Sequence, residues 1–273
     1  MKDDGSSSHH SLAEPPMLLA IDIGNTNVVL ALFQDGELLN SWRLHTRATH
    51  TSDDWWIAIQ RLYSDGQTGF DGVRSVIISS VVPVVGRALS DMCERYLQLT
   101  PLMVSAALPL DLGLDVEQPA TVGADRICNV VAARELYGSP CVIVDLGTAT
   151  TYDVVNAAGH FIGGAIAPGV ETGARQLFTG AALLSAVDLK VPDSAIGRDT
   201  ETNLQSGIVF GAVDQIDGMI GRIRAEMGWE ELPVILTGGL GDLLVGQLRT
   251  PVISDPDLTA KGLQLIHQRC GQD

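Results

Sequence analysis

Long hydrophobic runs are missing from this sequence. The longest nearly apolar run, Val73 to Val85, is interrupted by Arg74, three serines and Pro83, and it is too short to span a bilayer. Residues 1–16 hold a Ser run, a His pair and two prolines, but no apolar stretch that could form the core of a signal peptide. We therefore expect residues 1–16 to be a disordered leader, and the remaining chain to be a cytoplasmic protein that does not enter a membrane.

Cysteine is scarce, and its spacing excludes the common metal and redox motifs. Cys93, Cys128, Cys141 and Cys270 contain no C-x-x-C pair and lie in segments that read as helix or strand. Buried, reduced thiols are the expected state, which suits the cytosol.

Positive charge is also in short supply. The chain has 17 Lys and Arg against 33 Asp and Glu, which gives a formal net charge of −16. Most of such a surface repels the phosphates of nucleic acids and of anionic membranes, so we expect neither as a partner. A phosphate ligand would need local devices: backbone N–H groups, a few Arg or Lys side chains, and cations that bridge carboxylates to phosphate.

The usual nucleotide-binding motifs are absent as well. Neither G-x-x-x-x-G-K-[ST] nor a helix-opening G-x-G-x-x-G occurs, which argues against P-loop and Rossmann proteins. There is no G-x-S-x-G elbow, which argues against a serine hydrolase.

What the sequence does contain is an α/β pattern that recurs. Three short strands joined by turns occur in each half, at the start of the first half and after one helix in the second, and further helices and strands follow them. The first half, residues 17–121, is expected to hold strands 18–21, 28–33, 38–44 and 76–79 and helices 51–63 and 86–97. The second half, residues 122–273, is expected to hold helix 124–136, strands 141–144, 150–155, 161–166 and 233–236, helix 201–226, and a last helix, 258–270, that closes this half. We therefore expect two similar α/β halves.

A glycine turn follows the first strand of each half. Asp22-Ile-Gly-Asn-Thr and Asp145-Leu-Gly-Thr-Ala share an Asp, a Gly two residues later, and a polar residue. A glycine lets the backbone approach a phosphate, and the hydroxyl and amide groups of Asn25, Thr26, Thr148 and Thr150 can hydrogen-bond it. Asp22 and Asp145 would then hold Mg²⁺ or a monovalent ion beside that phosphate.

A simpler interpretation is that each Asp only caps its own turn. The recurrence, together with a third glycine turn at Thr237-Gly238-Gly239, favours a phosphate site.

Four motifs in register resemble the type III pantothenate kinases. They are Asp22-Ile-Gly-Asn-Thr-Asn, Gly123-Ala-Asp-Arg126, Asp145-Leu-Gly-Thr-Ala-Thr-Thr and Gly163-Gly-Ala-Ile-Ala-Pro-Gly169, and the resemblance runs from Met17 to about Arg269. It implies an actin and ribonuclease H-like fold of two α/β halves with mixed sheets and the active site in the cleft. It also implies phosphorylation of pantothenate by ATP, the first step of coenzyme A biosynthesis, in a homodimer whose active sites lie at the interface.

Residue roles follow from the same resemblance, position by position. ATP, with Mg²⁺, would lie against Asp22, Ile23, Gly24, Asn25, Thr26, Asn27, Val28, Val29 and Thr148. Pantothenate would contact Val116, Gly123, Ala124, Asp125, Arg126 and Thr200. The resemblance gives Asp125 the catalytic role, and it gives Asp145 the monovalent cation, K⁺ or NH₄⁺.

The residues themselves agree with the role of Asp125. A carboxylate at the start of a helix is kept ionised by exposed N–H groups and by the helix dipole, as a general base requires. Arg126 beside it can hold a substrate carboxylate with two parallel hydrogen bonds. The alternative for this pair is an ordinary helix-capping Asp and a surface Arg.

Two positions depart from the family, and one segment suggests assembly. Val116 stands where some members have a Tyr that contacts pantothenate, and His50 stands where many have Arg before Thr-x-Asp. We expect His50 to be solvated.

The adjacent glycines of segment 163–169 are expected to let two backbones approach across a two-fold interface.

Two other functions stay open at this point. A sugar or acetate kinase of the same architecture would share the glycine turns but not Gly123-Ala-Asp-Arg126. A transcription-accessory relative would keep the fold without turnover, and the presence of Asp22, Asp125 and Asp145 argues against it.

Overall fold

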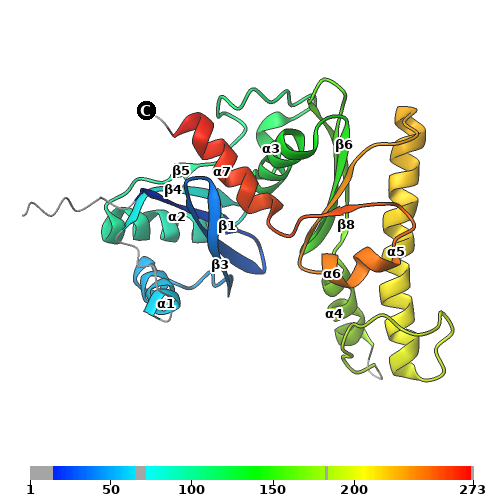
Figure 1. Cartoon of the computed structure of the whole chain (residues 1–273). Coiled ribbons are helices and arrows are strands. Elements are labelled where there is room, and N and C mark those ends of the chain that lie inside the picture. The colour runs from blue at the N-terminus through cyan, green and yellow to red at the C-terminus, as the bar shows by residue number, and fades with distance from the viewer. Residues whose placement is uncertain (1–14, 65–71, 182–183, 272–273) are drawn as a thin grey trace, which may run out of the picture.

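The computed structural model describes residues 15–64, 72–181 and 184–271, and its two five-stranded sheets lie side by side with helices between and around them (Figure 1). Residues 1–14 of the expected leader are outside the described residues. The first sheet has the order β3-β2-β1-β4-β5 and the second β10-β9-β6-β7-β8. Read from β8, the second sheet repeats the order of the first. The predicted recurrence of an antiparallel meander is therefore confirmed.

The strands have these bounds. The first sheet contains β1 (Met17–Ile23), β2 (Asn27–Gln34), β3 (Glu37–His45), β4 (Val73–Ser80) and β5 (Leu102–Met103). The second contains β6 (Cys141–Leu146), β7 (Ala149–Val155), β8 (Phe161–Pro168), β9 (Val234–Gly238) and β10 (Ile253–Ser254). Only the two-residue edge strands β5 and β10 were not predicted, because two residues carry no periodicity.

The α-helices are α1 (Ser52–Ser64), α2 (Pro83–Met92), α3 (Ala124–Tyr137), α4 (Val170–Gly180), α5 (Thr200–Met227), α6 (Gly241–Leu244) and α7 (Leu258–Cys270). The predicted helix 86–97 continues past α2 as one π-helical turn, Cys93–Leu97. Helix α4 is an element that the sequence analysis missed. In the part of the chain that the structure describes, no helix is long and apolar enough to cross a membrane.

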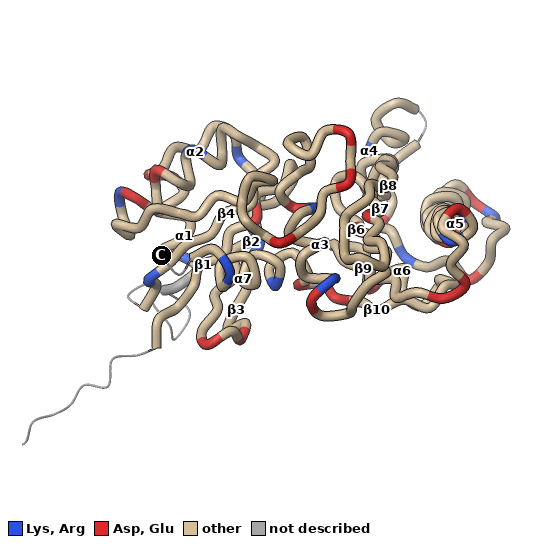
Figure 2. Tube along the Cα trace, turned by 90° about the horizontal axis from the view of Figure 1, so that it is seen from above, with Lys and Arg blue, Asp and Glu red and all other residues tan. Residues whose placement is uncertain are grey.

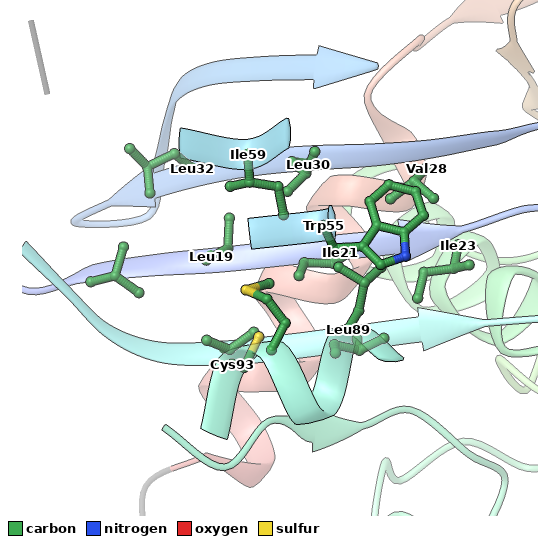
Figure 3. Packing of buried hydrophobic residues seen from close by; sticks show 14 of the residues in the cluster. Leu19, Ile21, Ile23, Val28, Leu30, Leu32, Trp55, Ile59, Leu89 and Cys93 are labelled. Atoms are coloured by element: carbon green, nitrogen blue, oxygen red, sulfur yellow. The ribbon is translucent and has the colours of Figure 1, made fainter. Parts of the chain in front are cut away.

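The outer face of the first sheet is covered by α1 and α2. Alternate residues of β1 and β2, such as Leu19, Ile21 and Leu30, meet the buried Trp55 and Leu89 of the two helices (Figure 3). All five side chains are almost fully buried. This face is a conventional hydrophobic core.

Helices α3 and α7 lie between the two sheets. Ile127 and Val131 of α3 pack with Leu263 and Ile266 of α7 on the inner face of the first sheet. Neighbouring residues of α3, including Val130, pack instead on the inner face of the second sheet. Helix α3 therefore joins the two halves.

The expectation that helix 258–270 closes the second half is wrong over most of its length. Leu258 touches the second sheet, but Ala260, Leu263 and Ile266 complete the core of the first sheet. Figure 1 shows α7, in red, running back over β1 and β4. Helical spacing identified the apolar face of this helix but could not say which sheet the face meets.

The long helix α5 covers the outer face of the second sheet. Val209, Ile216 and Ile220 pack there against the strands. Figure 2 looks nearly along α5 and shows it on the far side of the second sheet from the first sheet. The four cysteines are free thiols, and all but Cys270 are buried, as predicted.

Candidate active site

A cleft of about 500 Å³ lies between the two sheets, and the strand register brings the repeated aspartates into it. Successive side chains of a strand point to opposite faces. Leu19, Ile21 and Ile23 of β1 point to the outer core, so Asp22 points inward. In the same way, Val144 and Leu146 of β6 face α5, and Asp145 points inward.

The first glycine turn connects β1 to β2. Gly24 N–H donates to Asn27 O at 2.9 Å, and the Thr46 hydroxyl donates to Gly24 O at 2.6 Å, which fixes the turn. Of the residues predicted to contact ATP, Asp22, Gly24, Asn25, Thr26, Asn27 and Val29 line the cleft. Ile23 and Val28 have their side chains in the core, so only their backbone could face a ligand.

The second turn connects β6 to β7 and faces the first. Gly147 N–H donates to Ala149 O at 3.0 Å. The hydroxyls of Thr26 and Thr148 lie 2.8 Å apart and share a hydrogen bond between the halves. Both predicted turns therefore border one space. The expectation for Thr150 is wrong, because this residue is 1% exposed and does not line the cleft.

The third predicted turn, after β9, lies against the second. Gly238 has a φ of +94°, and a Cβ atom there would come within 2.6 Å of the Leu146 backbone. Gly239 N–H donates to Leu146 O at 3.2 Å. Thr237, Gly238 and Gly239 all line the cleft.

Three carboxylates share this cleft, and burial raises the pKa of each. Burial, with the nearby Asp125, raises the pKa of Asp22 to about 7. Burial also raises the pKa of Asp145 to about 6, although a hydrogen bond from Asn129 opposes the change. Burial raises the pKa of Asp125 too, which runs against the expectation that the helix start keeps this carboxylate ionised, although the N–H of Arg126 opposes the change. A cation bound in this cleft would favour the ionised form of these carboxylates.

Asn129 of α3 holds Asp145 and was not found in the sequence. Its Nδ2 donates to Asp145 Oδ2 at 2.9 Å, and its Oδ1 accepts from the Thr259 hydroxyl at 2.7 Å. The side chain is fully buried with both ends satisfied. Its position one helical turn after Asp125 was the available signal, since the two residues lie on neighbouring parts of one helix face.

Asp125 lies near the N-terminus of α3, as predicted. Gly123 is the N-cap, and a Cβ atom at Gly123 would lie 2.5 Å from Asp125 Oδ1, so the glycine makes room for the carboxylate. Asp125 Oδ1 accepts from Arg126 N–H at 2.8 Å. The carboxylate reaches the cleft, whereas Gly123 and Ala124 do not line it. A base placed here can meet an acceptor hydroxyl beside the glycine turns.

Arg126 points the other way, into a second cavity of about 260 Å³ that Val116 also lines. Its Nε donates to Asp153 Oδ1 at 2.7 Å, and its guanidinium lies 5.2 Å from the centre of the Phe161 ring. Asp153 is fully buried, and the sequence analysis missed it. The Nε edge of Arg126 is therefore already paired, so the expected two-bond clamp on a substrate carboxylate cannot use that edge.

Thr200 is the predicted site residue that the structure does not bring to the others. It opens α5 and lines neither cavity. Two glycines of segment 163–169 make close approaches within the chain, because side chains at Gly164 and Gly169 would collide with the backbone of Tyr152 and of Gly147. The expected approach across a two-fold interface stays a prediction.

His50 is not the solvated residue that we expected. Its ring lies 5.0 Å from that of Trp55, and its Nδ1 is buried without a hydrogen-bond partner among the described residues. The side chain packs on α1 and does not reach the cleft.

A bound cation fits the carboxylates of the cleft. Asp22 Oδ1 is buried and has no hydrogen-bond partner in the described residues. A carboxylate oxygen left in this way is costly unless a positive charge meets it. Within residues 15–64, 72–181 and 184–271, no three acidic, His or Cys side chains converge as a ready metal site. The remaining ligands would therefore come from backbone or from phosphate oxygens.

Comparison with known proteins identifies one family and several solved structures with the same fold. A family model described as Type III pantothenate kinase matches residues 18–222. A structure from Campylobacter jejuni, described as a Baf family transcriptional activator, is 20% identical with a TM-score of 0.54, covering 92% of this chain and 97% of that one. The ethanolamine utilization protein EutJ from Carboxydothermus hydrogenoformans is 15% identical with a TM-score of 0.53, covering 92% and 90%.

A third structure is component A of the (R)-2-hydroxyglutaryl-CoA dehydratase from Acidaminococcus fermentans. It is 13% identical with a TM-score of 0.54, covering 94% of this chain and all of that one (100%). At these identities the three structures show the shared fold and nothing about substrates.

Proposed function

Because this chain belongs to the type III pantothenate kinase family, we propose that it transfers the γ-phosphoryl group of ATP to pantothenate and releases ADP. Its two α/β halves form the actin and ribonuclease H-like fold expected from the sequence. The observation that carries the proposal is the position of Asp125, which faces the same cleft as the two glycine turns and the third turn at Gly238.

The nucleotide phosphates would lie between the first and second turns. Thr26 and Thr148 come from opposite halves and meet there, so each can exchange its shared hydrogen bond for one to a phosphate oxygen. Backbone approach is open at Gly24, where the cleft is lined by main chain. These groups are neutral, which means that they orient the phosphates without balancing their charge.

In the reaction, Asp125 would orient the primary hydroxyl of pantothenate and accept its proton. The hydroxyl oxygen bonds to the γ-phosphorus as the bond from that phosphorus to the β–γ bridging oxygen breaks. The products are 4′-phosphopantothenate and ADP. Phosphoryl transfer has a loose transition state, so positioning and charge neutralisation supply most of the catalysis. A base typically adds about 10²–10⁴-fold.

Asp22 and Asp145 would hold the cations. Mg²⁺ that accompanies ATP would be attracted by Asp22, whose Oδ1 has no partner in the described part of the chain. We place K⁺ or NH₄⁺ at Asp145, whose Oδ2 is already bonded to Asn129 and whose other oxygen is left for an ion. When bound, these ions would neutralise charge on the phosphate oxygens.

Pantothenate would extend from Asp125 toward the second cavity. Arg126 and Val116 line that cavity, and Asp153 and Phe161 hold the guanidinium in place. A substrate carboxylate can approach the remaining N–H groups of Arg126, because the Nε edge is occupied. Val116 contributes an apolar side chain to this cavity, at the position where some members of the family have a Tyr.

A homodimer would account for Thr200 and for the exposed edge of the second sheet. Strand β8 is an edge strand, and its Ile166 is 65% exposed. Leu177 of the adjacent α4 is 42% exposed. Pairing of two copies along this side would cover both side chains. Thr200, which lines no cavity of its own chain, would then be supplied to the site of the second copy.

The decisive experiment is an assay of ADP release from ATP. The enzyme is supplied with pantothenate, with common sugars, with acetate, or with no acceptor, and the phosphorylated product is identified by mass spectrometry. We expect ADP release to depend on pantothenate. Equal release with a sugar or acetate would make the chain another kinase of this fold. No release with any acceptor, from a folded protein that still binds nucleotide, would favour the regulatory alternative.

A further inference from the structure

The cleft contains a cationic side chain from the first sheet. Arg43, on β3, lines the cleft together with Asp22, Asp145 and the glycine turns. Strand register places it there: Asp22 pairs with Val29, and Val29 pairs with Arg43. Directly paired residues share one face of a sheet, so Arg43 lies on the inner face, two strands from Asp22.

The guanidinium of Arg43 reaches from the first half to the second. A Cβ atom on Gly239, in the third turn, would lie 3.2 Å from Arg43 Nη1. The positive charge also lowers the pKa of both Asp22 and Asp145, although burial outweighs it at each carboxyl. The side chain therefore lies near all three turns that surround the proposed phosphate space.

The positive charge of Arg43 is available to a ligand. Among the described residues, Arg43 makes no ion pair or hydrogen bond through its guanidinium. Arg126, in contrast, is paired with buried Asp153. Acidic side chains outnumber basic ones in the cleft, where Arg175 of α4 is the other cationic side chain among the described lining residues.

We propose that Arg43 binds the phosphate chain of the nucleotide, with its guanidinium forming charge-assisted hydrogen bonds to phosphate oxygens between the first and third turns. The assignment rests on the proposed use of ATP in this cleft. Phosphate bound at the glycine turns needs positive charge from elsewhere in the cleft, since these turns contain no Lys or Arg. A guanidinium offers several N–H groups in a fixed plane, which suits phosphate oxygens better than a single ammonium does.

The proposal separates phosphate recognition from recognition of the nucleoside. An Arg that touches phosphate contributes to binding of ADP and adds nothing to binding of adenosine. A charge-assisted hydrogen bond is worth about 1.5–3 kcal/mol, which corresponds to a loss of about 10-fold to 150-fold in affinity. Arg43→Gln should lose that factor for ADP alone. Arg43→Lys keeps the charge without the planar fork, so its affinity for ADP should lie between those of wild type and Arg43→Gln.

The test is calorimetric titration of the full chain with MgADP and, separately, with adenosine. Wild type is compared with Arg43→Gln, Arg43→Lys and Arg47→Gln. Arg47 is a matched control because it lies just after the same strand, carries the same charge and does not line the cleft. We expect Arg43→Gln to weaken MgADP binding at least 10-fold. Adenosine binding, and MgADP binding by Arg47→Gln, should change less than about twofold.

Each other result has a defined meaning. Equal loss of ADP and adenosine affinity in Arg43→Gln would show a structural effect and overturn the assignment. Unchanged ADP affinity would do the same while leaving the proposed kinase function intact. A similar loss in Arg47→Gln would reduce the effect to overall charge and also overturn it. Failure of folded wild type to bind MgADP would remove the proposed function, and the assignment with it.

Discussion

Asn129 Nδ2 donates a 2.9 Å hydrogen bond to Asp145 Oδ2, and this bond ties the helix of the proposed base to the second glycine turn. The other end of Asn129 accepts a 2.7 Å hydrogen bond from Thr259 on α7. One buried amide thus fixes three elements, β6, α3 and α7, around the cleft. The bond holds Oδ2 of Asp145 and so fixes the orientation of this carboxylate in the cleft.

We expect Asn129→Ala to destabilise the protein by about 1–3 kcal/mol, because it leaves buried Asp145 and Thr259 groups without partners. It should also raise the pKa of Asp145, since the lost hydrogen bond favours the ionised form. Urea unfolding at pH 8 measures the first effect. Thr259→Val, which removes only the outer hydrogen bond, is the control and should cost less. Equal stability of Asn129→Ala and wild type would contradict the role of the amide.

The raised pKa of Asp22 predicts a pH-dependent stability. Its folded pKa of about 7 lies above the ordinary Asp value of 3.8, so the folded state holds this proton more tightly than the unfolded state does. The stabilising contribution is present below about pH 4 and is lost as the pH rises through 7. Asp22→Asn, which imitates the protonated form, should therefore stabilise the ligand-free protein at pH 8, on the order of 2 kcal/mol, and little at pH 4.5.

The measurement is urea unfolding of both proteins across this pH range, without nucleotide or Mg²⁺. Wild type and Asp22→Asn should diverge between pH 5 and pH 8. Two stability curves that stay parallel would mean that Asp22 ionises normally in the folded protein. Added Mg²⁺ should narrow the gap at pH 8, because it meets the charge that the substitution removes.

Asp125→Asn should lower the rate of pantothenate phosphorylation about 10²–10⁴-fold, because the amide cannot accept the hydroxyl proton. MgADP affinity should stay within a few-fold of wild type, since Asp125 is assigned to the acceptor. Single-turnover assays give the first value and calorimetry the second. Turnover close to that of wild type would remove Asp125 from the mechanism.

Activity should require a monovalent cation in addition to Mg²⁺, with Asp145 as its ligand. Repulsion between unit charges roughly 4 Å apart is about 4 kcal/mol at an effective dielectric near 20, so Asp145 beside phosphate needs a counterion. The assay uses dialysed enzyme in Tris buffer, followed by titration with KCl or NH₄Cl. Asp145→Asn should lose the cation dependence. Full activity of wild type without either ion, or unchanged dependence in the variant, would show that the charge is balanced differently.

Asp153 should control the KM for pantothenate through Arg126. Burial raises the pKa of Asp153 to about 6, although Arg126 opposes the change. Below pH 6 the carboxylate takes up a proton and loosens its hold on Arg126, so the KM for pantothenate should rise as the pH falls. In Asp153→Asn the KM should be high at every pH between 5 and 8, while the KM for ATP stays unchanged. A parallel rise in both KM values would indicate a general structural effect.

The sequence was sufficient for the meanders and for the main aspartates. Period-two alternation identified the strands, and the recurrence of Asp-x-Gly placed Asp22 and Asp145 at equivalent strand ends. Their inward orientation follows from that alternation once the outer core residues are known. Confirmation of the fold rests on the repeated strand order, and the roles of these aspartates stay predictions.

Contacts between distant segments could not be predicted in the same way. Arg43, Asn129 and Asp153 lie within regular elements and match no motif, so only the packed structure reveals what they face. The same reason explains why α7 was expected to pack on the wrong half and why Thr150 was wrongly expected in the cleft. Helical or strand spacing defines which side of an element is apolar, and tertiary packing decides which neighbour covers it.

The crossing of α7 to the first sheet has a consequence for how the protein is made. The strands of that sheet are synthesised first, from Met17 to Met103, but Ala260, Leu263 and Ile266 complete its inner face. During translation, this face, which includes Leu18 and Phe33, stays incompletely covered until residues 258–270 have left the ribosome. The first half therefore cannot complete its core as an independent nascent domain, and its final packing is delayed until the residues of α7 have been synthesised.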